Sequence, residues 1–256
     1  MFPGFGMGGA QRRTVDLANS ILADRRHIIV ALDRNFSAAE QLRADIRVRL
    51  VSLGCKACSR PDLDNLRTFR RLIAHHRPEL LITYNWGTIE AAMANRLAPI
   101  CPHLHFEDGF GPNESPIRQL PRRVWARRLA LSGRSQIVVP SRTLLNVARG
   151  TWRFRSTRLH YIPNGIDFHR FTTPDSDPPM SLRKGTDEIL IGTVARLCAV
   201  KNIARLLRLF ATVKSDQPLR LIIVGDGPER SNLQALADDL GITEQTVFTG
   251  HQNQPE

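Results

Sequence analysis

The chain has 256 residues and a formal net charge of +12, from 36 Lys and Arg against 24 Asp and Glu. Hydrophobic residues make up 42% of it and charged residues 23%, a composition that excludes disordered and collagen-like chains. No uncharged apolar run approaches the roughly 20 residues of a membrane helix, and the first residues lack the order of a signal peptide. We therefore expect a cytoplasmic protein, either soluble or peripheral at the inner face of the cell membrane.

The four cysteines, Cys55, Cys58, Cys101 and Cys198, are too few for a disulfide framework at this length. Cys55 and Cys58 form a C-x-x-C pair, but no second pair of ligands follows at zinc-site spacing. We expect loop cysteines here and no metal site.

Apolar runs alternate with helical patterns along the first part of the chain, which is typical of βαβ units and a parallel sheet. A glycine-rich turn leads into an amphipathic helix that begins near Ala10. Helices are expected over 63–77 and 88–98. Strands are expected over 27–33, 46–53, 79–85, 103–108, 136–141 and 158–165.

A second βαβ series follows a polar, proline-rich stretch over 171–187, which has the composition of a linker. Its expected strands are 188–197, 219–227 and 246–250, with helices over 202–214 and 230–241. The sequence therefore predicts one domain over 1–170 and a second over 188–256. The chain opens inside a glycine turn with no strand ahead of it and stops after a third strand, so we expect a fragment at both ends.

The positive charge is concentrated between Ser115 and Ile166, a window that holds eleven arginines and no Asp, Glu or Lys. Within it, a helical pattern places Leu120, Val124, Trp125, Leu129 and Leu131 along one side and Arg122, Arg123, Arg127 and Arg128 mainly elsewhere. Such a helix is typical of a membrane-surface or anionic-ligand face. The alternative is a solvated helix whose apolar stripe packs on its own domain. Nucleic acid is not an expected partner, because aromatic residues are sparse and no nucleic-acid-binding pattern occurs.

Two glycine turns are candidate phosphate-binding elements. Gly6, Gly8 and Gly9 precede the first helix, where backbone N–H groups and the helix N-terminus favour an anion. Gly225 and Gly227 form a tight turn after a second-domain strand. Each turn by itself is equally compatible with an ordinary loop.

A pair of cations flanks a strand-to-helix turn in the second domain. Arg196 and Lys201 have no acid near them in sequence, and ligands bind parallel sheets at such turns. Two cations there suit a diphosphate, although a surface Arg and Lys beside a helix would look the same in isolation.

Taken together, five segments occur in the order and spacing of family 4 glycosyltransferases, which the chain resembles from about Gly6 to His251. The segments are GGAQRRTVDLA, VVPSRTL, YIPNGIDFHRF, GTVARLCAVKN and LIIVGDGPERSNLQALADDLGI. The resemblance implies the α/β fold called GT-B, with two Rossmann-like parallel-sheet domains facing across a cleft, the second one truncated here. It also implies retaining transfer of a sugar from a UDP- or GDP-sugar to a saccharide or lipid-linked acceptor, without a metal ion or other cofactor. Cell-surface polysaccharide or lipopolysaccharide assembly is the expected setting.

The resemblance assigns roles to individual positions. Gly8 and Gly9 match the loop that nears the donor diphosphate, and Arg196 and Lys201 match the pair that holds it. Gly225 and the Gly250–His251 turn resemble stretches that approach the base and ribose. His105 matches a histidine at a strand end that faces the reacting sugar, with Asp108 or Glu107 as the alternative polar group at the cleft.

The sequence departs from the family at its ends. Family members carry two glutamates separated by seven residues beyond the point that corresponds to Gly250, and the first strand of the first domain is missing as well. We therefore expect the chain itself not to catalyse transfer. The alternatives are a non-catalytic remnant that binds anionic surfaces and a GT-B nucleotide-sugar epimerase.

Overall fold

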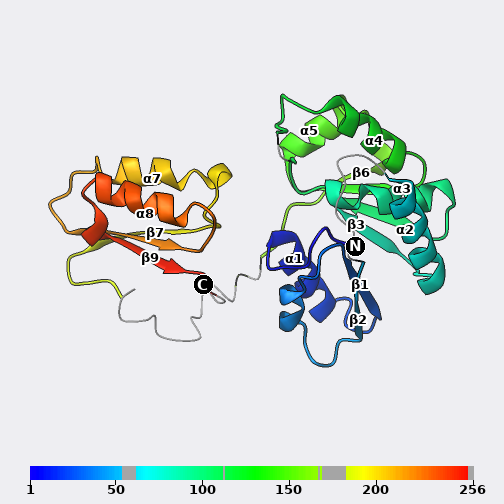
Figure 1. Cartoon of the computed structure of the whole chain (residues 1–256), viewed down its shortest axis with the longest axis horizontal. Helices are drawn as coiled ribbons and strands as arrows, with labels where there is room; N and C mark the ends of the chain where they lie inside the picture. The colour runs from blue at the N-terminus through cyan, green and yellow to red at the C-terminus, as the bar shows by residue number, and fades with distance from the viewer. Residues whose placement is uncertain (54–61, 112, 167, 169–182, 253–256) are drawn as a thin grey trace. The chain divides into compact units, whose positions relative to one another are not determined.

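The computed structural model describes residues 1–53, 62–111, 113–166, 168 and 183–252. The chain divides into two compact units, Met1–Gly165 and Ile166–Glu256, which are described separately (Figure 1). All pairings between the named strands of the described residues are parallel. The predicted α/β class with parallel sheets is therefore confirmed.

The strands of unit 1 form two sheets. One is two-stranded, β1-β2, and the other is four-stranded in the order β3-β4-β5-β6. The strands are β1 (His27–Ala31), β2 (Val48–Ser52), β3 (Leu81–Tyr84), β4 (His103–Phe106), β5 (Gln136–Val139) and β6 (Leu159–Tyr161). Each lies within a predicted strand. The central strands β3 and β5 are largely buried, as apolar runs in a parallel sheet should be, whereas β2 is largely exposed.

In the described residues of unit 1, five α-helices cover these sheets. They are α1 (Gly9–Asn19), α2 (Leu63–His76), α3 (Ile89–Leu97), α4 (Pro121–Leu131) and α5 (Arg142–Gly150), with the 3-10 turns η1 (Ser37–Gln41), η2 (Trp86–Thr88) and η3 (Ser156–Arg158). The largest core lies between α3, α4, α5 and the strands β5 and β6, around the fully buried Trp152. A second core joins α1 and β1 to Tyr84 at the end of β3.

Local signals in the sequence set the helix boundaries. Asp62 caps α2 by accepting a hydrogen bond from the Asp64 amide, and Arg77, in the left-handed conformation, ends the helix just before Pro78. Pro121 occupies the first turn of α4, where its missing N–H costs nothing. Ser141 caps α5 through the Leu144 amide.

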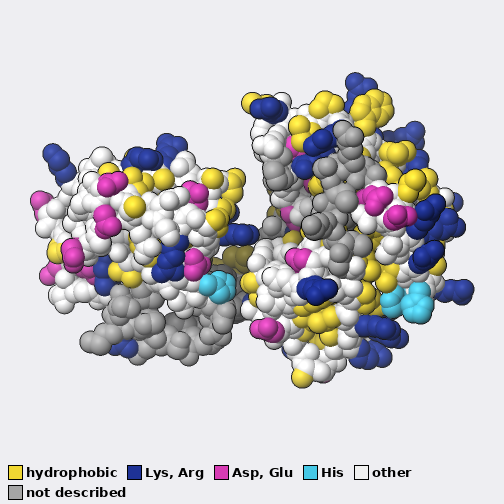
Figure 2. Space-filling model, viewed as in Figure 1, with side chains coloured by type: hydrophobic (Ala, Val, Ile, Leu, Met, Phe, Trp, Pro, Cys, Tyr) yellow, Lys and Arg dark blue, Asp and Glu magenta, His cyan; other side chains and the backbone are white. Residues whose placement is uncertain are grey.

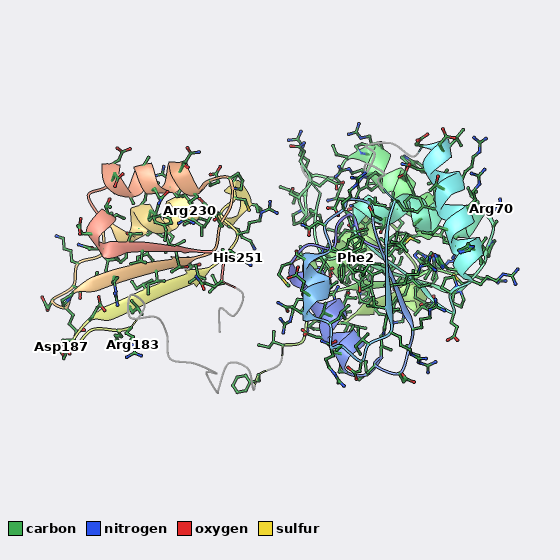
Figure 3. The ribbon with its side chains drawn as sticks, turned by 60° about the horizontal axis from the view of Figure 1, so that its bottom comes forward. Phe2, Arg70, Arg183, Asp187, Arg230 and His251 are labelled. Atoms are coloured by element: carbon green, nitrogen blue, oxygen red, sulfur yellow. The ribbon has the colours of Figure 1, made fainter. Side chains whose placement is uncertain are left out.

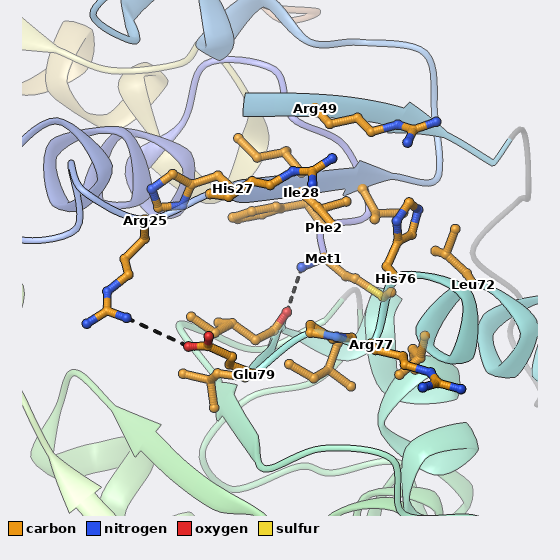
Figure 4. A pocket seen from close by; sticks show the side chains of 18 of the residues that line it. Met1, Phe2, Arg25, His27, Ile28, Arg49, Leu72, His76, Arg77 and Glu79 are labelled. Atoms are coloured by element: carbon orange, nitrogen blue, oxygen red, sulfur yellow. Dashed lines mark hydrogen bonds and ion pairs between the residues drawn. The ribbon is translucent and has the colours of Figure 1, made fainter. Parts of the chain in front are cut away.

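A cavity of about 860 Å³ separates the two sheets of unit 1, between β1 and β3 (Figure 4). Met1 and Phe2 line it between β1 and β3 and bond to both sides. The Met1 ammonium donates to the Ile82 carbonyl over 2.6 Å, and the Phe2 amide donates to the Val30 carbonyl over 2.8 Å. Burial lowers the pKa of the Met1 ammonium to about 5. The two sheets are therefore linked through the first residues of the chain.

Unit 2 is a three-stranded sheet in the order β7-β8-β9. Figure 1 shows α7 and α8 over one face of this sheet. The core lies beneath these helices around Leu207, Leu221 and Ile223. The elements are β7 (Ile189–Val194), η5 (Ala199–Lys201), α7 (Ile203–Phe210), β8 (Leu219–Val224), α8 (Arg230–Asp239), η6 (Thr243–Gln245) and β9 (Thr246–Gly250).

Several sequence predictions fall outside the described residues, namely the C-x-x-C pair Cys55 and Cys58 and most of the 171–187 linker. Among the helices that the structure describes, none is both long enough and apolar enough to cross a bilayer. Within the same residues, no three His, Cys, Asp or Glu side chains gather as a metal site would require.

Candidate functional site

In unit 1, polar residues gather where β3 and β4 end. Asn85 directly follows β3 and has a positive φ of 56°, and its side-chain oxygen accepts a hydrogen bond of 2.7 Å from the Asp108 amide. This bond fixes the start of the loop that follows β4. Because both strands are parallel, their carboxyl ends meet at one edge, which is where open α/β sheets bind ligands.

Arg13, on α1, reaches into this edge and organises it. Its guanidinium donates two hydrogen bonds to the Asp108 carboxylate, of 2.9 and 2.8 Å, and a third to the Asn164 side chain in the turn after β6. The same group lies 4.8 Å from the centre of the Phe106 ring. Four segments distant in sequence, which contribute Arg13, Asn85, Asp108 and Asn164, thus converge on one cluster. Sequence reasoning identified only Asp108 among them.

Asp108, a predicted catalytic residue, lies in this cluster with 16% of its side chain exposed. Both carboxylate oxygens accept from Arg13, so in this structure the group serves as an anchor. Both bonds come from one guanidinium nitrogen, Nη2, and as charge-assisted hydrogen bonds they hold the carboxylate against Arg13.

The structure contradicts the predicted position of His105 at an open cleft. His105 is fully buried, and its ring nitrogens contact the Thr83 hydroxyl over 2.7 Å and the Glu107 carboxylate over 3.2 Å. Alternation along β4 explains this placement, because His103 and His105 share one face of the strand and that face points into the core.

Glu107, the alternative polar group, is also buried and belongs to a charged network. Its carboxylate receives two hydrogen bonds of 3.2 Å from Arg127, which also binds Glu114 over 3.2 and 3.3 Å. Arg123 adds a bond of 3.1 Å to Glu114. Burial raises the pKa of Glu107, but the Arg127 charge and the His105 bond outweigh it, so the net pKa lies below its usual value. This network holds both ends of the loop that carries Asp108.

The prediction of a membrane-facing arginine group is therefore wrong for Arg123 and Arg127. Arg127 is 0% exposed and Arg123 is 9% exposed, whereas Arg122 is exposed and Arg128 is partly exposed. The physical reason is the pairing with two enclosed glutamates. The sequence held a signal for it, since Glu107 and Glu114 precede a long stretch without acids and Arg123 and Arg127 have i, i+4 spacing on a helix.

Gly8 and Gly9, at the start of α1, differ in what an added side chain would contact. A Cβ at Gly8 would approach only the flexible end of Gln11, and one at Gly9 would meet nothing within 4 Å. Gly8 has an extended backbone and Gly9 is the first residue of α1, so neither needs a left-handed conformation. Open space therefore remains above this helix N-terminus.

In unit 2, the predicted donor-binding residues lie at the carboxyl edge of the sheet. Arg196 follows β7 and Lys201 ends η5, and both are exposed. Within the described residues, neither of them forms an ion pair. Figure 3 shows His251 and Arg230 at this end of the sheet and Arg183 and Asp187 at the other.

Gly225, predicted to approach the nucleotide, has a structural requirement of its own. Its φ is +135°, and a Cβ there would lie 2.0 Å from the Ala195 carbonyl oxygen. Its amide donates to the Gly250 carbonyl over 2.8 Å, and Gly250 has a φ of +76°. These glycines bring the ends of β7, β8 and β9 together.

Replacing Gly225 with alanine is expected to destabilise unit 2 by at least about 2 kcal/mol, because the new Cβ would meet backbone in a conformation that L residues rarely adopt. Urea unfolding of the whole chain measures this loss. Gly192→Ala, in β7, is the matched control, since nothing lies within 4 Å of a Cβ there. Equal stabilities of the two variants would contradict the prediction.

Comparison with known proteins agrees with this architecture. The family model described as "Glycosyltransferase Family 4" matches residues 7–170, and the one described as "Glycosyl transferases group 1" matches 179–256. In a solved structure, HepE from Anabaena in complex with UDP and glucose resembles the chain with a TM-score of 0.74 at 21% identity, over 99% of this chain and 69% of that one. Two parallel-sheet units of this kind are those of the GT-B fold. The chain belongs to Glycosyltransferase Family 4.

Curated relatives are similar over shorter stretches. A GDP-mannose-dependent alpha-(1-6)-phosphatidylinositol monomannoside mannosyltransferase of Mycolicibacterium smegmatis is 36% identical over 97 residues, which are 37% of this chain and 25% of the relative. The putative glycosyltransferase EpsF of Bacillus subtilis is 28% identical over 174 residues, 58% of this chain and 45% of that protein. The chain thus spans less than half the length of both relatives.

Proposed function

We propose that the chain is part of a retaining glycosyltransferase that moves a sugar from a UDP- or GDP-sugar to a saccharide or lipid-linked acceptor in cell-surface polysaccharide or lipopolysaccharide biosynthesis. In this proposal unit 1 binds the acceptor and unit 2 contributes to the donor site. The observation that carries it is the pair Arg196 and Lys201, which are exposed at the carboxyl edge of the unit 2 sheet and form no ion pair with the residues that the structure describes. A relative that acts on a phosphatidylinositol mannoside supports the lipid-linked class of acceptor.

The chemistry of transfer explains why two free cations suit this position. The leaving nucleoside diphosphate gains negative charge as the bond to the sugar breaks, and fixed cations there stabilise the transition state. A cation already paired with a carboxylate would offer much less, because the partner would have to be displaced. Arg196 and Lys201 form no ion pair within the described residues, so no partner would have to be displaced when a diphosphate binds.

Unit 1 adds a second kind of support. Neither contacts nor backbone dihedrals of the protein require glycine at Gly9, so its lack of a side chain fits the close approach of a ligand to the N-terminus of α1. The Arg13–Asp108 cluster, at the edge formed by β3 and β4, supplies rigid polar groups for a saccharide. In the proposed site Asp108 orients hydroxyl groups, and the buried His105 acts only by positioning Glu107.

Nucleotide binding by the chain tests the donor site. We expect UDP or GDP to bind, and the double variant Arg196→Ala with Lys201→Ala to weaken that binding about 100-fold, measured by titration calorimetry. The matched control is Arg205→Ala with Lys214→Ala, which removes the same charge from two other exposed positions of unit 2. Equal weakening by both pairs would show non-specific attraction and refute the proposed site.

A Gly9→Ala variant separates binding from stability. Because a Cβ at Gly9 meets nothing within 4 Å and alanine favours helices, the unfolding temperature should be unchanged or slightly higher. Affinity for the nucleotide-sugar should nevertheless fall at least about tenfold, since the new methyl group occupies the space proposed for the diphosphate. Unchanged affinity would remove unit 1 from the donor site.

A further inference from the structure

Helix α4 buries two of its arginines and exposes two of its large apolar side chains, while Val124 and Leu131 of the predicted apolar side are buried. Arg123 and Arg127 point into the protein, while Trp125 is 68% exposed and Leu129 is 51% exposed. Helical spacing puts Arg122, Trp125 and Leu129 on one side, with Arg128 next to them. We call these four residues the α4 outer face.

The outer face is fixed by contacts of Arg128. Its guanidinium carbon lies 5.2 Å from the centre of the Trp125 ring, and the group donates to the carbonyls of Thr151 and Trp152 over 2.7 and 3.2 Å. These bonds hold Trp125 against a cation and bring the loop after α5 beside α4. The next residue of that loop, Arg153, is exposed.

Only positive charge accompanies these apolar side chains. Residues 115–166 contain eleven arginines and no acid, and the acid just before them, Glu114, is enclosed and bound to Arg123 and Arg127. Figure 2 shows exposed hydrophobic side chains beside Lys and Arg at the end of unit 1 that Figure 1 marks with α4 and α5. The surface therefore combines an exposed Trp–Leu pair with Arg122, Arg128 and Arg153, which form no ion pair in the part of the chain that the structure describes.

We propose that the α4 outer face docks unit 1 onto an anionic lipid surface. Trp125 and Leu129 enter the boundary between headgroups and acyl chains, where an indole ring is favourably placed. Arg122, Arg128 and Arg153 bind lipid phosphates in the headgroup layer. Charge complementarity selects an anionic bilayer over a second copy of this chain, whose corresponding face carries the same charge. The proposal is independent of sugar transfer, because docking needs neither donor nor acceptor.

Vesicles of phosphatidylglycerol and phosphatidylcholine test the proposal with the whole chain. We expect binding to vesicles rich in phosphatidylglycerol and at least tenfold weaker binding to pure phosphatidylcholine. Trp125 also reports on docking, because it is 68% exposed whereas the other two tryptophans, Trp86 and Trp152, are partly and fully buried. Lipids brominated near the top of their acyl chains should quench its fluorescence, and the Trp125→Phe variant should lose this quenching.

Substitutions distinguish binding through the α4 outer face from non-specific attraction by the positive charge of the chain. Trp125→Ala with Leu129→Ala should weaken vesicle binding at least about tenfold, and Arg122→Gln about fivefold. The matched control is Arg208→Gln with Leu209→Ala on α7, where an arginine and a leucine are also exposed, and it should bind like the parent chain. Absence of quenching, or equal losses in the α4 and α7 variants, would overturn the proposal. So would a change of oligomeric state on Trp125→Ala in place of a loss of vesicle binding.

Discussion

Replacing Arg127 with leucine is expected to destabilise the chain by about 3–5 kcal/mol, because it leaves the enclosed carboxylates of Glu107 and Glu114 without their common partner. Arg127 also stacks on Trp152, with 4.7 Å between its guanidinium carbon and the ring centre, so packing is lost as well. Urea unfolding at pH 7 measures the effect. Arg122→Leu, an exposed change one turn away, should stay within about 0.5 kcal/mol of the parent chain.

A triple variant tells an uncompensated charge from lost packing. Arg127→Leu combined with Glu107→Leu and Glu114→Leu removes three of the four charges of the network and leaves Arg123, which stacks on Trp86 at its edge. Replacing buried ion pairs together is often close to neutral. We expect it to recover most of the stability that Arg127→Leu loses. If the triple variant were as unstable as the single one, the loss would come from packing and loop geometry.

Acid should destabilise unit 1 through His103, by about 3 kcal/mol between pH 7 and pH 4. His103 is 5% exposed and lies between the hydroxyl groups of Thr83 and Ser135, each 2.8 Å away. Burial, with a smaller contribution from the charge of His105, lowers the pKa of His103 from 6.5 to about 3. Between these values the unfolded chain binds the proton and the folded one does not, so stability falls as the pH falls from 6.5 towards 3.

The variant His103→Asn isolates this contribution. The Met1 ammonium, Glu107 and Glu114 also have lowered pKa values in the folded chain, so they too contribute less stability at low pH. The free energy of unfolding therefore falls with pH in the His103→Asn variant as well. The difference between parent and variant, followed by urea unfolding from pH 7 to pH 4, should shrink by about 3 kcal/mol. A difference that stays constant over this range would mean that His103 is charged in the folded chain.

The fold followed closely from the sequence because its signals are local. Each predicted strand contains an observed one, since short runs rich in β-branched residues, such as HIIVA and LIIV, are typical of strands inside a parallel sheet. The prediction from the α4 pattern was wrong for Arg123 and Arg127, and the reason is physical. Hydrophobic periodicity assumes that charged side chains face water, whereas Arg123 and Arg127 are drawn inward by glutamates that lie before the helix in the sequence.

The candidate site was predicted only in part, because no local sequence pattern shows which distant segments come together in the fold. Arg196 and Lys201 could be proposed from their own turn, and both are exposed. The cluster of Arg13, Asn85, Asp108 and Asn164 joins four separate segments, and only the register of the sheet brings them together. His105 lies in the core and not at the sheet edge because side chains alternate between the two faces of β4, and His105 shares the buried face with His103.

The bonds at the start of the chain have a consequence for the order of folding. Phe2 stacks on Tyr84 with 4.2 Å between ring centres, and Tyr84 stacks on Phe106 over 5.0 Å. The contact that joins the two sheets therefore connects residues about eighty positions apart, and such long loops are slow to close. During synthesis, β1 and β2 can pair early, but their seam with β3 and β4 closes only after residue 106 has left the ribosome. Until then the aromatic face of Phe2 is open to other partners.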